Sequence, residues 1–208
     1  MTVLPSRNCI VRLSRYKNAL HRFRTLGFIK VFSDTLAEEV GVTSSQVRKD
    51  FSLFGISGKK RGGYDLDELI EKLNNIFGKD RLEKVVVIGC GNIGRALINY
   101  KGFEREGIKI TACFDIDPAK CKKEAAVPVL AMEDLCAYVN ENGIKIGIIA
   151  VPDIAARQVM GSMVSAGIKG ILNFAPLELK APGGTVINNV NLGLELENLI
   201  YFVNSVSD

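Results

Sequence analysis

A glycine-rich stretch has the spacing of a loop that binds a dinucleotide. It consists of Gly89, Cys90, Gly91, Asn92, Ile93 and Gly94. A run typical of a strand precedes it and a run typical of a helix follows, which is the order found in dinucleotide-binding folds. We expect Gly89 to make the tight turn, Gly91 to admit a pyrophosphate, and Gly94 to let helix and strand pack closely. The amides that open the helix would bind the phosphates.

An acid stands where such a fold holds the ribose of its nucleotide. Asp115 closes the next strand-like stretch and lies 21 residues after Gly94, close to the ~20 expected of this acid. Its carboxylate would accept hydrogen bonds from the ribose hydroxyls and would repel a 2′-phosphate. We therefore expect the cofactors NAD and NADH in preference to their phosphorylated forms. Lys120, Lys122 and Lys123 weaken that preference, although a solvated charged run explains them more simply.

Two further strand-like stretches, 145–152 and 170–176, flank a helical stretch. Repeated strand–helix units predict a parallel, doubly wound sheet with its ligand at the carboxyl ends of the strands. The residues at these ends that we predict as nucleotide contacts are Val151, Pro152, Asn173 and Phe174. Structural capping or core packing explains each of them equally well. For Met160 and Met163 core packing is the better explanation.

The residues that hydride transfer needs are scarce in this chain. Transfer to a carbonyl usually requires a proton donor near the nicotinamide. His21 is the only histidine and lies outside this region, no Tyr-x-x-x-Lys occurs, and Tyr100 is the only obvious polar aromatic residue near the glycine loop. We therefore predict no catalytic residue and interpret the nucleotide as a signal. An NAD-dependent oxidoreductase with a basic accessory domain is the alternative.

The N-terminal part of the chain differs in charge from the rest. Residues 1–64 contain 12 Lys/Arg against 4 Asp/Glu, whereas residues 65–208 contain 15 against 19. A basic module joined to a mildly acidic body is expected of a protein that binds a polyanion. A basic face that is merely solvated would give the same charges.

Three helices are expected in this basic module. Apolar spacing predicts the first over 10–26, and Ser33 is expected to cap a short second helix that Gly41 ends. Thr43 and Gln46 have the spacing of a capping box, so a third helix should begin at once. Two short helices joined by a tight turn indicate a helix-turn-helix.

The third helix places Val47, Phe51 and Phe54 on one apolar face and leaves a polar, basic face. The residues on and beside that face that we predict to bind DNA are Ser44, Ser45, Gln46, Arg48, Lys49 and Ser52. Arg and Gln suit guanine and adenine edges in the major groove, and Lys and Ser suit phosphates. The next stretch predicts the wing of a winged helix, with further DNA contacts at Lys59, Lys60, Arg61 and Tyr64. A helical oligomerisation module with a solvated loop is the alternative.

Composition argues against several classes of protein. No apolar run approaches the ~18–20 residues that span a bilayer. The N-terminus lacks the pattern of a signal peptide, so we expect a cytoplasmic protein without a membrane partner. The five cysteines are scattered without a C-x-x-C pair, so we expect no metal and interpret them as small core residues in a reducing compartment.

Six stretches follow one another along nearly the whole chain: "SSQVRKDFSLFG", the basic wing ending in Tyr64, "VVVIGCGNIGRAL", "FDIDPAK", "IAVPDIAARQV" and "AGIKGILNFAPLEL". Together they resemble the Rex family of redox-sensing transcriptional repressors. The resemblance implies a homodimeric winged-helix repressor that senses the NADH/NAD⁺ balance. It also implies palindromic operators in double-stranded DNA, release by NADH, and exchange of a C-terminal helix between subunits.

The predicted architecture is therefore α/β. A winged helix-turn-helix domain over 1–80 is followed by a Rossmann-like doubly wound parallel sheet over 81–188 and a C-terminal dimerisation helix over 189–208. The last helix carries an apolar stripe of Leu192, Leu196, Leu199, Ile200 and Val203. A helix packed on its own domain would show the same stripe, so the exchange rests on the resemblance alone.

The chain departs from the family pattern in two places. In the wing, Lys60 stands at a usual arginine and Arg61 at a usual glycine. The family's redox switch is described as a charged contact of Arg, Tyr and Asp, and these positions hold Asn18, Tyr100 and Asn191 here. We expect NADH still to bind more tightly than NAD⁺, because the oxidised ring carries a charge, but to release DNA less completely. The expected walls of the nicotinamide pocket are Phe103, Phe174 and Leu192.

Overall fold

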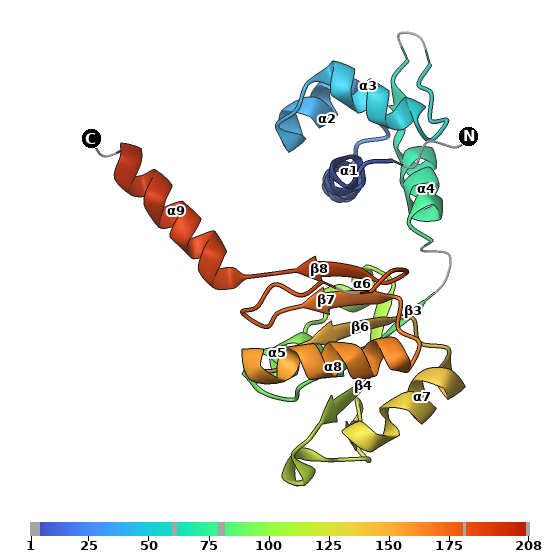
Figure 1. The fold of residues 1–208 in the computed structure, drawn as a ribbon. Coiled ribbons are helices and arrows are strands. Elements are labelled where there is room, and N and C mark those ends of the chain that lie inside the picture. The colour runs from blue at the N-terminus through green and yellow to red at the C-terminus, as the bar shows by residue number, and fades with distance from the viewer. Residues whose placement is uncertain (1–4, 60–61, 79–81, 181, 207–208) are drawn as a thin grey trace. The chain divides into compact units, whose positions relative to one another are not determined.

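The computed structural model describes residues 5–59, 62–78, 82–180 and 182–206. Contacts within the chain define two compact units, Met1–Arg81 and Leu82–Asp208 (Figure 1). The last helix belongs to the second unit.

The first unit contains helices and one small antiparallel sheet. Its helices are α1 (Arg7–Thr25), α2 (Ser33–Val40), α3 (Ser44–Ser52) and α4 (Leu66–Ile76). The sheet pairs β1 (Lys30–Val31) with β2 (Tyr64–Asp65). The arrangement is that of a winged helix, as predicted, with α2 and α3 as its helix-turn-helix.

Local capping explains where these helices begin and end. Gly41 ends α2 in the left-handed conformation (φ 74°), and the Thr43 hydroxyl accepts from the Gln46 amide at the start of α3. The prediction that Ser33 caps α2 is wrong. Phe32 holds the cap position, and the Ser33 hydroxyl instead accepts from the Arg48 guanidinium at 2.9 Å. The capping box is only half formed, because the Gln46 side chain donates forward to Asp50.

One apolar core holds the four helices of this unit together. Leu13 and Leu20 of α1 lie in it, with Val47 and Phe51 of α3. Leu73 of α4 belongs to the same core. α4 therefore packs into the core of this unit, within the predicted domain 1–80.

The second unit is built on a sheet of six parallel strands. They are β3 (Glu83–Ile88), β4 (Ile108–Asp115), β5 (Val129–Ala131), β6 (Ile146–Ile149), β7 (Gly170–Asn173) and β8 (Val186–Asn189). Their order across the sheet is β5-β4-β3-β6-β7-β8, with parallel pairing throughout. This order reverses direction at β3, as in a Rossmann fold, and confirms the predicted doubly wound sheet.

Helices cover both faces of this sheet (Figure 1). The helical segments are α5 (Asn92–Ile98), α6 (Gly102–Arg105), α7 (Leu135–Asn142), α8 (Asp153–Ser165) and the 3₁₀ turns η1 (Pro118–Lys120) and η2 (Met132–Asp134). Alternate residues of β3 enter opposite cores: Val86 packs with α7 and α8, and Val87 packs with α5 and α6. Met163 of α8 is fully buried in the first of these cores, as expected.

The last helix, α9 (Leu192–Val206), follows β8, and none of its described side chains is buried. Asn191 caps it, because its side-chain oxygen accepts from the Leu194 amide at 3.2 Å. Packing of this helix on its own domain, which the sequence left open, is therefore not observed. Among the described helices, none is long and apolar enough to cross a membrane.

Candidate functional site

The glycine loop connects β3 to α5 as the sequence predicts. Gly89 adopts φ 102°, a left-handed conformation that favours glycine. Gly94 is buried in the first turn of α5, and a Cβ atom there would collide with the Gly89 carbonyl oxygen. Gly91 has open space around the position of a Cβ atom. The backbone can therefore turn tightly, pack the helix against the strand and leave room beside Gly91.

Asp115 lies at the carboxyl end of β4 and is 7% exposed. Its carboxylate accepts from the amides of Cys90 at 2.7 Å and Asp117 at 2.9 Å, and from the Lys120 ammonium at 3.1 and 3.3 Å. Burial would by itself raise the pKa of Asp115, but these three donors outweigh it and hold the pKa below its ordinary value. The group is therefore ionised at neutral pH and suited to accept from hydroxyls.

A cleft of about 610 Å³ opens between the glycine loop and the ends of β4 and β6. This volume falls within the range of small-molecule sites, roughly 300–1,000 Å³. Of the predicted contacts, its lining includes Gly89, Gly91, Asp115, Val151 and Pro152. Lys120 lines it as well, and its ion pair with Asp115 differs from the solvated run that the sequence favoured.

Seven of the twelve predicted contacts lie outside this lining, and three of them are also outside the glycine loop. Tyr100 follows α5, is 60% exposed and packs edge-to-face on Phe103, beside a separate cavity of about 450 Å³. Asn173 is fully buried, and its side chain bonds to Ala175, Leu177 and Asn189. Phe174 packs against the core on the α5 side of the sheet.

The remaining loop residues surround the start of α5. The Cys90 side chain is buried in the core on the α5 side, while its amide donates to Asp115. Asn92 and Ile93 are exposed on the first turn of the helix.

Replacing Asp115 by asparagine should weaken NADH binding by about tenfold, because the ribose loses a charged acceptor. NADPH should bind better to this variant than to the unaltered protein. The repulsion of a 2′-phosphate is gone, and Lys120 is freed to attract it. Isothermal titration with both nucleotides measures this. Asp117→Asn is the control, because it removes an acid two residues away and should preserve the preference for NADH. Equal binding of NADH and NADPH by the unaltered protein would refute the assignment of Asp115 to the ribose.

The second candidate site is the exposed face of α3. Ser45, Arg48, Lys49 and Ser52 are exposed, and Ser44 and Gln46 are half-buried. This side of the helix can reach base edges and phosphates in a major groove.

One residue of α3 that the sequence interpretation missed is Asp50. It is 1% exposed, and its carboxylate accepts from Arg12 at 2.6 and 2.7 Å, from the Tyr16 hydroxyl at 3.0 Å and from Gln46 Nε2 at 2.8 Å. Burial would raise the pKa of Asp50, but the hydrogen bonds from Arg12, Gln46 and Tyr16 outweigh it and lower the pKa. Asp50 lies on the same face of α3 as Val47 and Phe51, and this position in the sequence already indicates that its side chain faces the core.

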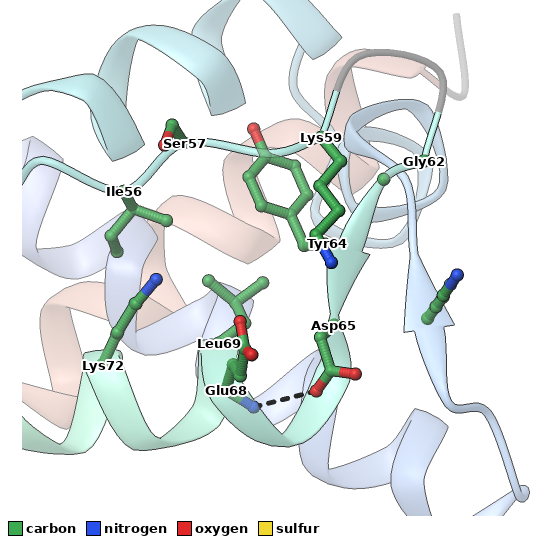
Figure 2. A pocket seen from close by; sticks show the side chains of 11 residues that line it. Ile56, Ser57, Lys59, Gly62, Tyr64, Asp65, Glu68, Leu69 and Lys72 are labelled. Carbon is green, nitrogen blue, oxygen red and sulfur yellow. Dashed lines mark hydrogen bonds between the residues drawn. The ribbon is translucent and has the colours of Figure 1, made fainter.

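The wing forms beside α3. Lys59 pairs with Gly63 in an antiparallel bridge, and the Tyr64 ring packs edge-to-face on Phe51. A hollow of about 90 Å³ next to the wing is lined by Lys30, Lys59 and Lys72 among others. Figure 2 shows this hollow with Lys59 and Lys72 at its edge. This hollow is too small for a nucleotide. Lys60 and Arg61, predicted as DNA contacts, lie outside the described residues.

Lys59→Ala should weaken binding to a preferred duplex and to a scrambled one by the same factor. Removing one contact with a phosphate should lower the salt slope of log affinity by about one. Arg48→Ala should instead reduce the ratio between the two affinities. Fluorescence anisotropy at several salt concentrations separates the two effects. A Lys59→Ala variant with an altered ratio and an unchanged slope would contradict the phosphate role.

The described residues contain no group of three or more His, Cys, Asp or Glu side chains that could hold a metal ion. Cys9, Cys90 and Cys113 are buried, Cys121 is half-buried and Cys136 is exposed; all five are free thiols. Burial raises the pKa of the Cys113 thiol, which disfavours its thiolate form at neutral pH.

A basic winged helix and a Rossmann sheet with an acid in its cleft together define a class: transcription regulators that respond to a nucleotide. A family model described as "Putative DNA-binding protein N-terminus" matches residues 6–52, and one described as "CoA binding domain" matches residues 80–177. The redox-sensing transcriptional repressor Rex of Lactobacillus acidophilus is 42% identical over 195 residues, which are 93% of this chain and 92% of that protein. Rex of Desulforamulus reducens is 40% identical over 193 residues, 92% of each chain.

Solved structures agree with these relatives. RSP in complex with beta-NAD⁺ and operator DNA has a TM-score of 0.92 at 34% identity, covering 99% of this chain and 95% of that one. RSP in complex with beta-NADH has a TM-score of 0.87 at 34% identity, covering 99% and 97%. The chain belongs to the Rex family of redox-sensing transcriptional repressors.

Proposed function

We propose that this protein is a DNA-binding repressor that senses the NADH/NAD⁺ ratio and leaves palindromic operators when NADH binds. The observation that carries the proposal is the presence, in one chain, of a basic α3 face and a cleft with the ionised Asp115. RSP, similar over nearly the whole chain, has been solved with operator DNA and with NADH. We expect the protein to act in the cytoplasm, together with its operator DNA.

Selection from random duplexes tests this function. The full-length protein should enrich a two-fold symmetric sequence whose half-sites are separated by whole helical turns. Enrichment should disappear when NADH is included in the binding step. Failure to prefer any duplex over the starting pool would refute the repressor function.

We place the nucleotide in the 610 Å³ cleft, with its pyrophosphate on the glycine loop and its ribose on Asp115. To accept two ribose hydroxyls, Asp115 must share the lone pairs that Lys120 now occupies. Lys120 is exposed and can move aside. Val151 and Pro152 would border the nicotinamide half of the nucleotide.

A homodimer is the form in which we expect the protein to bind its operator. Nine large apolar side chains of α9 are more than half exposed: Leu192, Leu194, Leu196, Leu199, Ile200, Tyr201, Phe202, Val203 and Val206. So large an exposed apolar surface on one helix is expected to be covered by a partner. A second copy of the chain supplies the cover, and exchange of α9 between copies is the arrangement that the family implies.

We assign a regulatory role to the cleft, in preference to hydride transfer. The described residues that line it include neither histidine nor tyrosine to serve as a proton donor. Absorbance at 340 nm with small aldehydes, ketones and hydroxy acids tests this assignment. Turnover of NADH with any of them would restore the oxidoreductase alternative.

Asn18 and Asn191 should weaken the coupling between NADH binding and release of DNA. Asn18 is exposed on α1 and Asn191 caps α9. Neither side chain is charged, so we expect these two positions to form no ion pair in either dimer arrangement. Installing Asn18→Arg and Asn191→Asp together should sharpen release by NADH, and aspartate at 191 would still cap the helix. Operator affinity measured against NADH concentration tests this. An unchanged release curve in the double variant would show that these positions do not couple the sites.

A further inference from the structure

Asp50 is a buried acid on a helix whose other face is basic and exposed. Arg12 of α1 holds its carboxylate at two points, 2.6 and 2.7 Å, and Tyr16 adds a third hydrogen bond at 3.0 Å. The fourth donor is Gln46, one turn earlier on α3, at 2.8 Å. A chain of contacts thus runs from α1 through Asp50 to a side chain at the start of the DNA-facing helix.

The chemistry of this chain fixes which way the Gln46 amide points. An ionised carboxylate only accepts, so the group of Gln46 that faces Asp50 must be Nε2 rather than Oε1. One N–H is used in that bond, which leaves the second N–H and Oε1 for another partner. In the major groove, the remaining N–H can donate to N7 of adenine while Oε1 accepts from its N6 amino group.

We infer that Asp50, anchored by Arg12, is a positioning residue that holds the Gln46 amide ready to read one adenine in each half-site. This inference rests on the proposed function. A glutamine held before DNA arrives loses less side-chain freedom on binding, and it cannot turn its amide over to match a different base. The base preference of α3 therefore depends on a residue that DNA never touches.

A purely structural role for Asp50 makes a different prediction. If the cluster only joined α3 to α1, its loss would lower affinity for every duplex in proportion to the loss of stability. Tyr16→Phe separates the two roles. It removes one hydrogen bond to Asp50 and leaves the bond between Asp50 and Gln46 in place.

The test measures affinities of the full-length protein for its selected operator and for duplexes with each half-site base pair replaced in turn. We expect one A·T pair per half-site whose replacement costs about 10- to 100-fold. Gln46→Ala should abolish that preference, and Asp50→Asn should reduce it by about fivefold or more while sparing the other positions. Adding Asp50→Asn to Gln46→Ala should cause no further loss of preference at that pair. Tyr16→Phe should lower the melting temperature and keep the preference.

Equal losses on all duplexes with Asp50→Asn, or a loss of the same preference with Tyr16→Phe, would overturn the inference. If Asp50→Asn does not fold, Arg12→Lys is tested in its place. Lysine keeps the positive charge at position 12 but cannot make the two-point contact with the Asp50 carboxylate. That variant should reduce preference at the same pair by about threefold, and no change at that pair would count against positioning. If an operator is selected but Gln46→Ala leaves its base preferences unchanged, the positioning role alone is refuted. If the selection yields no operator at all, the repressor function itself is refuted.

Discussion

Replacing Gly94 by alanine should give a repressor that binds its operator but is not released by NADH at concentrations that release the unaltered protein. A Cβ atom at this position would collide with the carbonyl oxygen of Gly89, so α5 must move and carry the loop amides out of place. Overpacking of this kind costs about 1–3 kcal/mol, and a cost of this size set against NADH binding corresponds to roughly 5- to 150-fold in affinity. The winged helix lies in the other unit, so operator binding without nucleotide should be unaffected.

Gly161→Ala is the matched control for this variant. It makes the same chemical change inside α8, where nothing lies within 4 Å of the added atom. Titration followed by the fluorescence of NADH itself, and operator binding with and without NADH, provide the two readouts. A Gly94→Ala protein with unaltered NADH affinity would contradict the placement of the nucleotide on this loop.

Leu199→Glu should convert the protein to a monomer and lower its operator affinity by about 100-fold or more. Leu199 lies on the apolar stripe of α9 and is 58% exposed in the single chain. A charge there would have to be buried against a second copy, at a large desolvation cost. A monomer can hold only one half-site at a time, so it lacks the avidity of two linked half-site contacts.

Sedimentation measures the dimer, and anisotropy measures operator affinity in the same samples. Asn204→Glu serves as the control, because it adds the same charge on the side of α9 that carries Glu197. This control should remain dimeric. A Leu199→Glu variant that stays a dimer with full affinity would show that α9 is not the dimer contact.

Local rules were enough to predict most of the fold. The apolar strand, glycine loop and Asp115 of the second unit lie where the spacing placed them, and Gly41 and Thr43 bound the turn between α2 and α3. Periodicity and capping act over a few residues, so they can be recognised without knowledge of distant partners. The two short strands β5 and β8 were missed. β8 is mostly exposed and polar, so its sequence lacks the apolar run that marks a strand.

Two features of the sites that sequence reasoning missed depend on distant partners. Asp50 is buried because Arg12, 38 residues earlier, neutralises it. The Asp50–Arg12 pair forms through tertiary packing, and no local pattern encodes it. Asn173 lies at the expected strand end, but its side-chain amide also donates to Asn189, 16 residues later, which local reasoning does not predict. Lys120 lies only five residues after Asp115, and the turn η1 brings its ammonium back to that carboxylate.

The central claim is that one chain couples NADH binding to release of DNA. The most direct test is the affinity of the full-length protein for one selected operator, measured without nucleotide, with saturating NAD⁺ and with saturating NADH. We predict that NADH lowers operator affinity and that NAD⁺ leaves it near the value without nucleotide. The same operator affinity in all three conditions, with NADH binding verified in the same buffer, would contradict the claim.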